Sequence, residues 1–195
     1  MAIPHPRYPL EEIPEVPIDF DVMCCPRSIS DLSTKIRLGY IGPKVRLIIK
    51  SATFPVLLPT SVYKEWKNIT VFFGGSENSF NALRLGYRIH KSKGFPLKIF
   101  TNSKKNPEDF YRDLLRHHPL FSKIESGEVE WQFHETGKFQ DHFYDIPHDS
   151  LIVIGAYGHG LIKELLFGST MELFQSRMPN TMLIVGPNYE EDAML

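Results

Sequence analysis

The residues best suited to chemistry are glycines and hydroxyl side chains near the end of the chain. Gly155, Gly158 and Gly168 are separated by two and nine residues, and Ser169 and Thr170 follow directly. Glycines after a strand allow a sharp turn and a close backbone approach to a ligand, and the N–H groups at a helix start suit an anion. The spacing is typical of a phosphate site. The same residues also fit a plain strand exit followed by a helix that Ser169 caps.

A second glycine pair follows an apolar run earlier in the chain. Gly74, Gly75 and Ser76 open the sequence GGSENS, which nearly matches the Ser-Gly-Gly-x-Asp-Ser loop of the ATP pyrophosphatases. Here Phe73 and Asn78 replace the two outer serines, so the hydroxyl groups of that loop are displaced. Because short glycine motifs often arise by chance, an adenylating enzyme of the ATP pyrophosphatase type is only a minor alternative.

The histidines and acids form no catalytic or metal-binding pattern. His159 lies inside the glycine loop, where it either donates to a phosphate or is an exposed loop residue. His134, His142 and His148 lack the spacing of a metal site, and the motif HExxH is absent. Hydrolysis of a nucleotide needs an oriented water and a base. We therefore predict no metal ligands, no catalytic residues and at most weak ATPase activity.

Composition excludes several function classes. The chain of 195 residues has 22 Lys and Arg against 23 Asp and Glu, so no general positive charge draws it to nucleic acid or to an anionic membrane. Apolar stretches fall short of the roughly 20 residues that span a bilayer, and the first 21 residues carry prolines and acids where a signal peptide would be apolar. The sequence predicts a cytoplasmic protein in which Cys24 and Cys25 are reduced.

Short apolar runs alternate with amphipathic segments from about residue 68 onward. This alternation is typical of βαβ units in a doubly wound parallel sheet, which binds ligands at the carboxyl ends of its strands. Expected strands cover residues 69–73, 94–101, 127–135, 150–155 and 181–187. Expected helices cover residues 80–89, 106–118, 137–146 and 160–178.

The N-terminal part repeats the end of this layout. Residues 42–59 align with residues 168–187, and both Gly42 with Gly168 and Pro55 with Thr181 give an offset of 126. A constant offset indicates an internal repeat. We therefore predict a degenerate partial domain at residues 1–67 and a full domain at residues 68–195. The partial domain is expected to add two strands, with the outer one, at residues 19–25, as an edge strand that another chain can cover.

The sequences GAYGHGLIKELLFGS, VFFGGSENSFNALRLGYRI and TMLIVGP together resemble the universal stress protein family over residues 68–187. The resemblance implies an α/β fold with a five-stranded parallel sheet of order 3-2-1-4-5, of the HUP-like nucleotide-binding class. It also implies that Gly155, Gly158, Gly168 and Ser169 surround the ribose and phosphates of ATP. The full set of residues expected to bind the nucleotide is Gly74, Gly75, Ser76, Thr101, Ile154, Gly155, Gly158, His159, Gly168, Ser169 and Thr170.

One position departs from the family pattern. The first strand of the family usually ends in Asp-Gly-Ser, with a carboxylate that reaches toward the ribose or adenine, and here Gly74 occupies the Asp position. Loss of a charge-assisted hydrogen bond costs about 1 to 3 kcal/mol, which is at most about a hundredfold in affinity. Glu77 is near enough in sequence to replace the carboxylate, or is a helix-start acid that favours the dipole.

The resemblance and the residues together predict a stress-response or signalling protein that binds ATP, AMP or ADP, with or without Mg²⁺. Bound nucleotide would bias association with a second copy or another partner, and members of the family pair through their last strands in homodimers or tandem chains. The alternative function is a nucleotide-free interaction scaffold, such as the soluble module of a larger assembly or transporter. Gly74 favours this alternative, whereas the complete glycine and serine spacing favours nucleotide binding.

Overall fold

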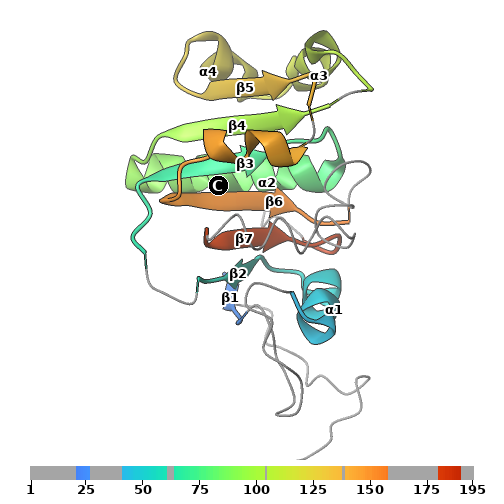
Figure 1. Ribbon diagram of the computed structural model, residues 1–195, viewed down its shortest axis with the longest axis vertical. Coiled ribbons are helices and arrows are strands. Elements are labelled where there is room, and N and C mark those ends of the chain that lie inside the picture. Colours follow the sequence, from blue (N-terminus) through green and yellow to red (C-terminus); the bar gives the residue numbers. More distant parts are fainter. Residues whose placement is uncertain are drawn as a thin grey trace, which may run out of the picture.

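The computed structural model describes residues 21–26, 41–60, 64–103, 105–137, 139–157 and 180–189, which form a seven-stranded sheet with helices on both faces (Figure 1). The strands are β1 (Met23–Cys24), β2 (Val56–Leu58), β3 (Asn68–Phe72), β4 (Leu97–Asn102), β5 (Glu130–His134), β6 (Ser150–Gly155) and β7 (Met182–Val185). The helices are α1 (Pro43–Ser51), α2 (Glu77–Lys93), α3 (Glu108–Leu115), α4 (Phe121–Glu125) and the 3-10 helix η1 (Phe139–Asp145). None of these described helices is long and apolar enough to cross a membrane.

Five strands form the parallel part of the sheet. Their order is β5-β4-β3-β6-β7, and β3 pairs in parallel with both β4 and β6. In chain order these are strands 3-2-1-4-5, so the predicted α/β class and strand order are confirmed. The direction of winding reverses between β3 and β6, which is the point where doubly wound sheets bind ligands.

The N-terminal strands extend this sheet beyond β7. β2 pairs antiparallel to β7, with Leu57 opposite Leu183, and β1 pairs in parallel with β2 at the edge. The expected docking of two further strands is therefore confirmed, and the sheet has seven strands where the family pattern implied five. The assignment of residues 1–67 to a degenerate repeat and of residues 68–195 to a full domain stays a prediction.

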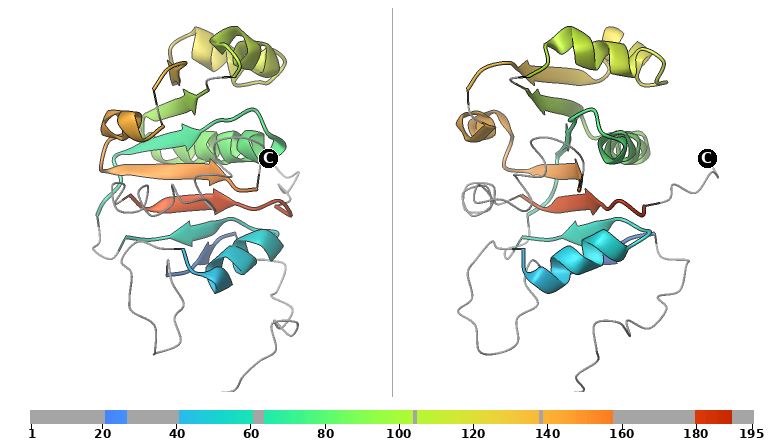
Figure 2. Two further views of the ribbon diagram at one scale, coloured as in Figure 1. Left: turned by 45° about the vertical axis from the view of Figure 1, so that its right-hand side comes forward. Right: turned by 90° about the vertical axis from the view of Figure 1, so that its right-hand side faces the viewer.

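Two apolar layers enclose the sheet, and Figure 2 shows the helices that cover each face. On one face α2, α3 and α4 pack on side chains such as Val71, Ile99 and Val153. On the other face α1 and η1 pack on alternate residues, among them Ile152 and Ile184. All six residues of β6 are buried, as expected of a continuous apolar run covered on both faces.

Local sequence signals account for α2, the longest helix described. Ser76 caps its start, Glu77 lies in its first turn, and basic residues fill its last turn before Gly94, which adopts a left-handed conformation. Gly86 faces β3 so closely that an added Cβ atom would lie 2.4 Å from Cγ2 of Val71. The helix therefore packs directly on the sheet, and this fixes its first turn at the carboxyl end of β3.

Two other helical segments differ in detail from the sequence prediction. The expected helix at residues 106–118 is shorter, as α3, and α4 follows as a separate helix that the pattern did not indicate. The segment predicted as a short helix at residues 137–146 is the 3-10 helix η1. The expected helix at residues 160–178 lies outside the described residues.

Candidate functional site

The carboxyl ends of β3, β4 and β6 meet at one edge of the sheet. Phe72 is in register with Phe100 on one side and with Ile154 on the other. The predicted residues 74–76, which follow β3, and Gly155, which ends β6, therefore gather around this edge. Ile154 itself is completely buried, so its side chain is part of the core.

Gly155 makes the closest backbone contact at this edge. An added Cβ atom would lie 2.2 Å from the carbonyl oxygen of Asn78 and 2.6 Å from the amide nitrogen of Ser79. The Asn78 side-chain amide also donates to the carbonyl oxygen of Ala156. What approaches Gly155 on this side is thus the first turn of α2. The contact locks the exit of β6 against the start of that helix, and it accounts for this glycine without a ligand.

The turn after β3 is shaped by Gly75 and Ser76. Gly75 has a positive φ of 74°, and an added Cβ atom would lie 2.9 Å from Cδ1 of Leu114. The Ser76 hydroxyl accepts a hydrogen bond from the amide of Ser79 at 3.3 Å, and the Ser79 hydroxyl donates to the Ser76 carbonyl at 2.6 Å. The Ser76 hydroxyl therefore acts as the N-cap of α2. The other N–H groups of the first turn of a helix have no partner within the helix.

The structure places both Gly74, which replaces the family's aspartate, and Glu77, the predicted substitute for its carboxylate. Gly74 is half-buried at the end of β3, and Glu77 is exposed in the first turn of α2. The glutamate thus stands near the strand-end edge on the helix that begins there. Its position matches that of an acid favoured by the helix dipole, which was one of the two roles predicted for it.

Thr101 is held in the core. Its hydroxyl donates to the carbonyl oxygen of Phe73 at 2.9 Å and accepts from Nε1 of Trp131 at 3.1 Å, and the residue is 1% exposed. Both hydrogen bonds link neighbouring strands beneath α2 and α3. An adenine contact at Thr101 would therefore have to use its main chain.

Replacing Thr101 with valine is expected to lower the free energy of unfolding by about 1 to 3 kcal/mol, because the buried Phe73 carbonyl and the Trp131 indole each lose a partner. Urea unfolding followed by tryptophan fluorescence measures the change. Thr101→Ser is the matched control, since it keeps the hydroxyl and removes one methyl group. Equal stability of the Val and wild-type proteins would contradict the structural role of this hydroxyl.

Tyr157 is a site residue that sequence patterns did not identify. It leaves β6 with a positive φ of 60°, and its hydroxyl donates to the carbonyl oxygen of Arg46 in α1 at 2.8 Å. Burial raises the pKa of the Tyr157 phenol, while the nearby Arg46 charge acts in the opposite direction. The residue therefore ties the exit of β6 to the N-terminal part of the chain. An aromatic residue in a glycine-rich loop gives no spacing signal for such a contact.

A second group of polar side chains lies at the end of β5. His134 in β5 and His142 and Asp145 in η1 offer ligand atoms that all lie within 4.8 Å of one another. Burial, and then the proximity of His142, lower the pKa of His134, whereas the Asp145 charge acts to raise it. The sequence predicted no such cluster, because the separation of these residues matches no known metal motif.

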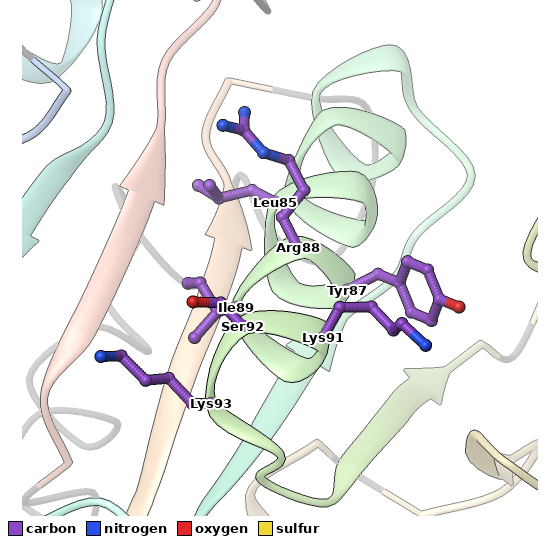
Figure 3. Close-up of a pocket in the computed structure, with 7 residues that line it drawn as sticks. All are labelled: Leu85, Tyr87, Arg88, Ile89, Lys91, Ser92 and Lys93. Carbon is purple, nitrogen blue, oxygen red and sulfur yellow. The ribbon is translucent and has the colours of Figure 1, made fainter. Parts of the chain in front are cut away.

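The surface of α2 carries a shallow hollow away from the strand-end edge. It is lined by Leu85, Tyr87, Arg88, Ile89 and the last turn of the helix (Figure 3). Because α2 begins at the carboxyl end of β3 and ends just before β4 begins, this half of the helix lies toward the amino ends of the strands. The hollow is therefore separate from the predicted nucleotide site.

Comparisons with known proteins rest on structure. No protein-family model matches the chain, and no curated protein matches it by sequence. A universal stress protein from Archaeoglobus fulgidus DSM 4304 superposes with a TM-score of 0.58 and 18% identity, over 86% of this chain and 61% of that one. The chain has the universal stress protein fold.

Two structures from Pseudomonas aeruginosa give the same result. One, from strain UCBPP-PA14 and assigned to the universal stress proteins, matches with a TM-score of 0.56 and 14% identity over 86% of this chain and 64% of that one. The other, a functionally unknown protein from strain PAO1, matches with a TM-score of 0.54 and 13% identity over 86% and 63%. The chain thus spans less than two thirds of the length of these three structures.

Part of the predicted phosphate site of this universal stress protein fold lies outside the described residues. These positions are Gly158, His159, Gly168, Ser169 and Thr170. The described residues end at Tyr157 on one side of this segment and begin again at Asn180 on the other. The role of the five residues therefore stays a prediction from their spacing.

Proposed function

We propose that this chain is a universal stress protein that binds an adenine nucleotide at the carboxyl edge of its sheet. The observation that carries the proposal is the parallel pairing of β3 with β6, in which Phe72 lies opposite Ile154. It brings the start of the Gly-x2-Gly-x9-Gly-Ser segment next to the glycine turn at residues 74–76. Two glycine-containing segments at the switch point of a doubly wound sheet form the usual setting for a bound nucleotide.

In this proposal the nucleotide is ATP, AMP or ADP, with Mg²⁺ as an optional companion. Backbone N–H groups near Gly158, Gly168 and Ser169 bind the phosphates, and His159 and Thr170 lie close enough in sequence to assist. The described part of the chain holds no set of residues at this edge that would orient and activate a water. As in the sequence prediction, the protein is proposed as a cytoplasmic binder with at most weak ATPase activity.

The proposed mechanism is differential binding. A nucleotide that binds one assembly state more tightly than another shifts the population toward it. Here the nucleotide would order the segment after β6, and the shift would favour a homodimer or a complex with another partner in a stress or signalling response. Within the chain, β2 already pairs with the outer side of β7. The last strand of the domain is therefore paired by a segment of the same chain.

The first experiment is a nucleotide inventory of the purified protein. The protein is denatured, and the released small molecules are identified and counted by mass spectrometry. We expect close to one adenine nucleotide per chain, which would also show that Gly74 is tolerated in place of the carboxylate. An empty protein that fails to bind millimolar ATP with Mg²⁺ would overturn the proposal.

The second candidate function is a nucleotide-free interaction module, and Gly74 is the observation that favours it. The variants Gly158→Val and Gly168→Val separate the two functions, because each puts a side chain where phosphate is proposed to lie. Nucleotide binding predicts at least a hundredfold loss of ATP affinity, about 2.7 kcal/mol, with nearly unchanged melting. Gly127→Ala is a control for ATP affinity, which it should leave unchanged: nothing lies within 4 Å of an added Cβ atom there, although its positive φ of 77° should cost roughly 1 to 2 kcal/mol of stability.

The adenylating enzyme is the weakest alternative. Its loop needs hydroxyl groups that face pyrophosphate, whereas the Ser76 hydroxyl accepts the Ser79 amide and the Ser79 hydroxyl is fully buried. Release of pyrophosphate from ATP in the presence of candidate acceptors would be evidence for this adenylating activity.

A further inference from the structure

We propose that His134, His142 and Asp145 form a binding site for one Zn²⁺ ion at the end of β5. This site is separate from the proposed nucleotide site and does not depend on it. β5 is the outermost strand on its side of the sheet, and two strands, β4 and β3, lie between it and β6.

The distances match those between the ligands of a zinc ion. Nε2 of His134 lies 3.4 Å from Oδ2 of Asp145, and Nδ1 of His142 lies 3.6 Å from the same oxygen. In a tetrahedral site with metal–ligand distances of about 2.0 to 2.1 Å, two ligand atoms are roughly 3.3 Å apart. The two distances to Asp145 are therefore close to those that one ion requires, and all three ligand atoms lie within 4.8 Å of one another.

The strongest evidence for a metal ligand is the buried Nε2 atom of His134. Within the described part of the chain, its Nε2 atom makes no hydrogen bond. The 3.4 Å contact with Asp145 is at ion-pair distance but does not have hydrogen-bond geometry. A buried polar atom without a partner is costly, and coordination of a metal ion would satisfy it.

The second ring is held in the tautomer that a metal requires. Nε2 of His142 lies 2.9 Å from the carbonyl oxygen of Thr136, and a carbonyl can only accept. In the neutral ring Nε2 is therefore the donor and the lone pair is on Nδ1, which lies 3.6 Å from Oδ2 of Asp145. A histidine that binds zinc commonly donates its other N–H to a carbonyl in this way.

The turn before η1 is built around this ring. Gly137 has a positive φ of 81°, and an added Cβ atom would lie 2.7 Å from Nε2 of His142. The glycine thus lets the turn pass close enough for the Thr136 carbonyl to reach the imidazole. The rings of His142 and His134 stack with centroids 3.8 Å apart and planes 22° apart. Because an imidazole lone pair lies in the plane of its ring, binding of one ion by both rings requires the half-buried His142 ring to tilt out of this stack.

The ligand types select the metal class. Two imidazole nitrogens and one carboxylate suit Zn²⁺ and similar transition metals, whereas Mg²⁺ and Ca²⁺ prefer oxygen ligands. Three protein ligands leave a fourth position for water or another ligand. Asn102 at the end of β4 is in register with His134, and its buried Oδ1 atom has no hydrogen-bond partner among the described residues. This oxygen is a suitable acceptor for a water on the ion.

Zinc titration of the full chain tests the proposal. The protein is treated with a chelator, dialysed and titrated with Zn²⁺ alone by calorimetry, and Co²⁺ is used as a spectroscopic probe of tetrahedral coordination. We expect one Zn²⁺ per chain, a raised melting temperature and no comparable response to Mg²⁺. The variants His142→Phe, which keeps an aromatic ring on His134, and Asp145→Asn, at an exposed position, should each weaken zinc binding by about 100-fold or more.

His148→Phe is the matched control, because His148 is an exposed histidine in the same segment. It should leave both the zinc affinity and the cobalt spectrum unchanged. The proposal is overturned if the wild-type chain takes up no stoichiometric Zn²⁺, or if Asp145→Asn and His142→Phe bind it as tightly as wild type. A loss as large in His148→Phe would also overturn it, since surface histidines would then explain the binding.

Discussion

Gly155→Ala is expected to lower the free energy of unfolding by about 3 kcal/mol or more. The added Cβ atom would lie 2.2 Å from the carbonyl oxygen and 2.3 Å from the carbonyl carbon of Asn78. These are backbone atoms in the first turn of α2, so no side-chain rotation relieves the overlap. The end of β6, the start of α2, or both would have to move. Thermal and urea unfolding of the purified variant measure the loss.

Gly94→Ala supplies the control for this prediction. Gly94 has a positive φ of 71°, but nothing lies within 4 Å of an added Cβ atom. Alanine there should cost roughly 1 to 2 kcal/mol from backbone conformation alone. A Gly155→Ala protein as stable as Gly94→Ala would show that the strand end and α2 are not in close contact. The result also bears on function, because a variant at Gly155 loses stability whether or not a phosphate binds there.

Phe73→Ala is expected to cost about 3 to 5 kcal/mol, the range for truncating a large buried aromatic residue. Phe73 is 2% exposed and lies directly after β3. Its ring makes edge contacts with Phe80, Tyr111 and Trp131 at centroid distances of 5.0, 6.3 and 6.1 Å. Removing the ring would leave a cavity between α2, α3 and the sheet, directly beneath the glycine turn.

Two variants calibrate the Phe73 measurement. Phe73→Leu keeps most of the buried volume and should cost about 1.5 kcal/mol or less. Phe110→Ala removes a ring that is 43% exposed on α3 and should stay within about 0.5 kcal/mol of wild type. If Phe73→Ala and Phe110→Ala were equally stable, the aromatic cluster would not be the core that its burial indicates.

Much of the fold could be predicted because it depends on short-range signals. The continuous apolar run of β6 indicates a strand buried on both faces, and Ser76 and Gly94 mark the ends of α2. The family resemblance implied pairing between the last strands of two repeats, and β2, within residues 42–59, does pair with β7. The strand order came from the family resemblance, since pairing order leaves no local trace in the sequence.

Other features depend on contacts that no sequence pattern encodes. The three-residue strand β2 carries no signal for its antiparallel direction, which arises from its packing beside β7. That Gly155 makes room for a phosphate stays a prediction, and a glycine at a strand end does not reveal that a helix backbone lies against it. His134 and His142 come together because η1 folds back over the end of β5, so a strand and a 3-10 helix, rather than one helix face, bring the side chains together.

The pairing of β2 with β7 limits the order in which the sheet can form during translation. Leu57 pairs with Leu183, which is 126 residues later in the chain. At about 5 to 20 residues per second, the ribosome needs roughly 6 to 25 seconds to make that stretch. Throughout this interval the apolar residues of β2 exist without β7, their partner on one side. The β2 segment is therefore one to which a chaperone has time to bind, and β2 can join the sheet only late in folding.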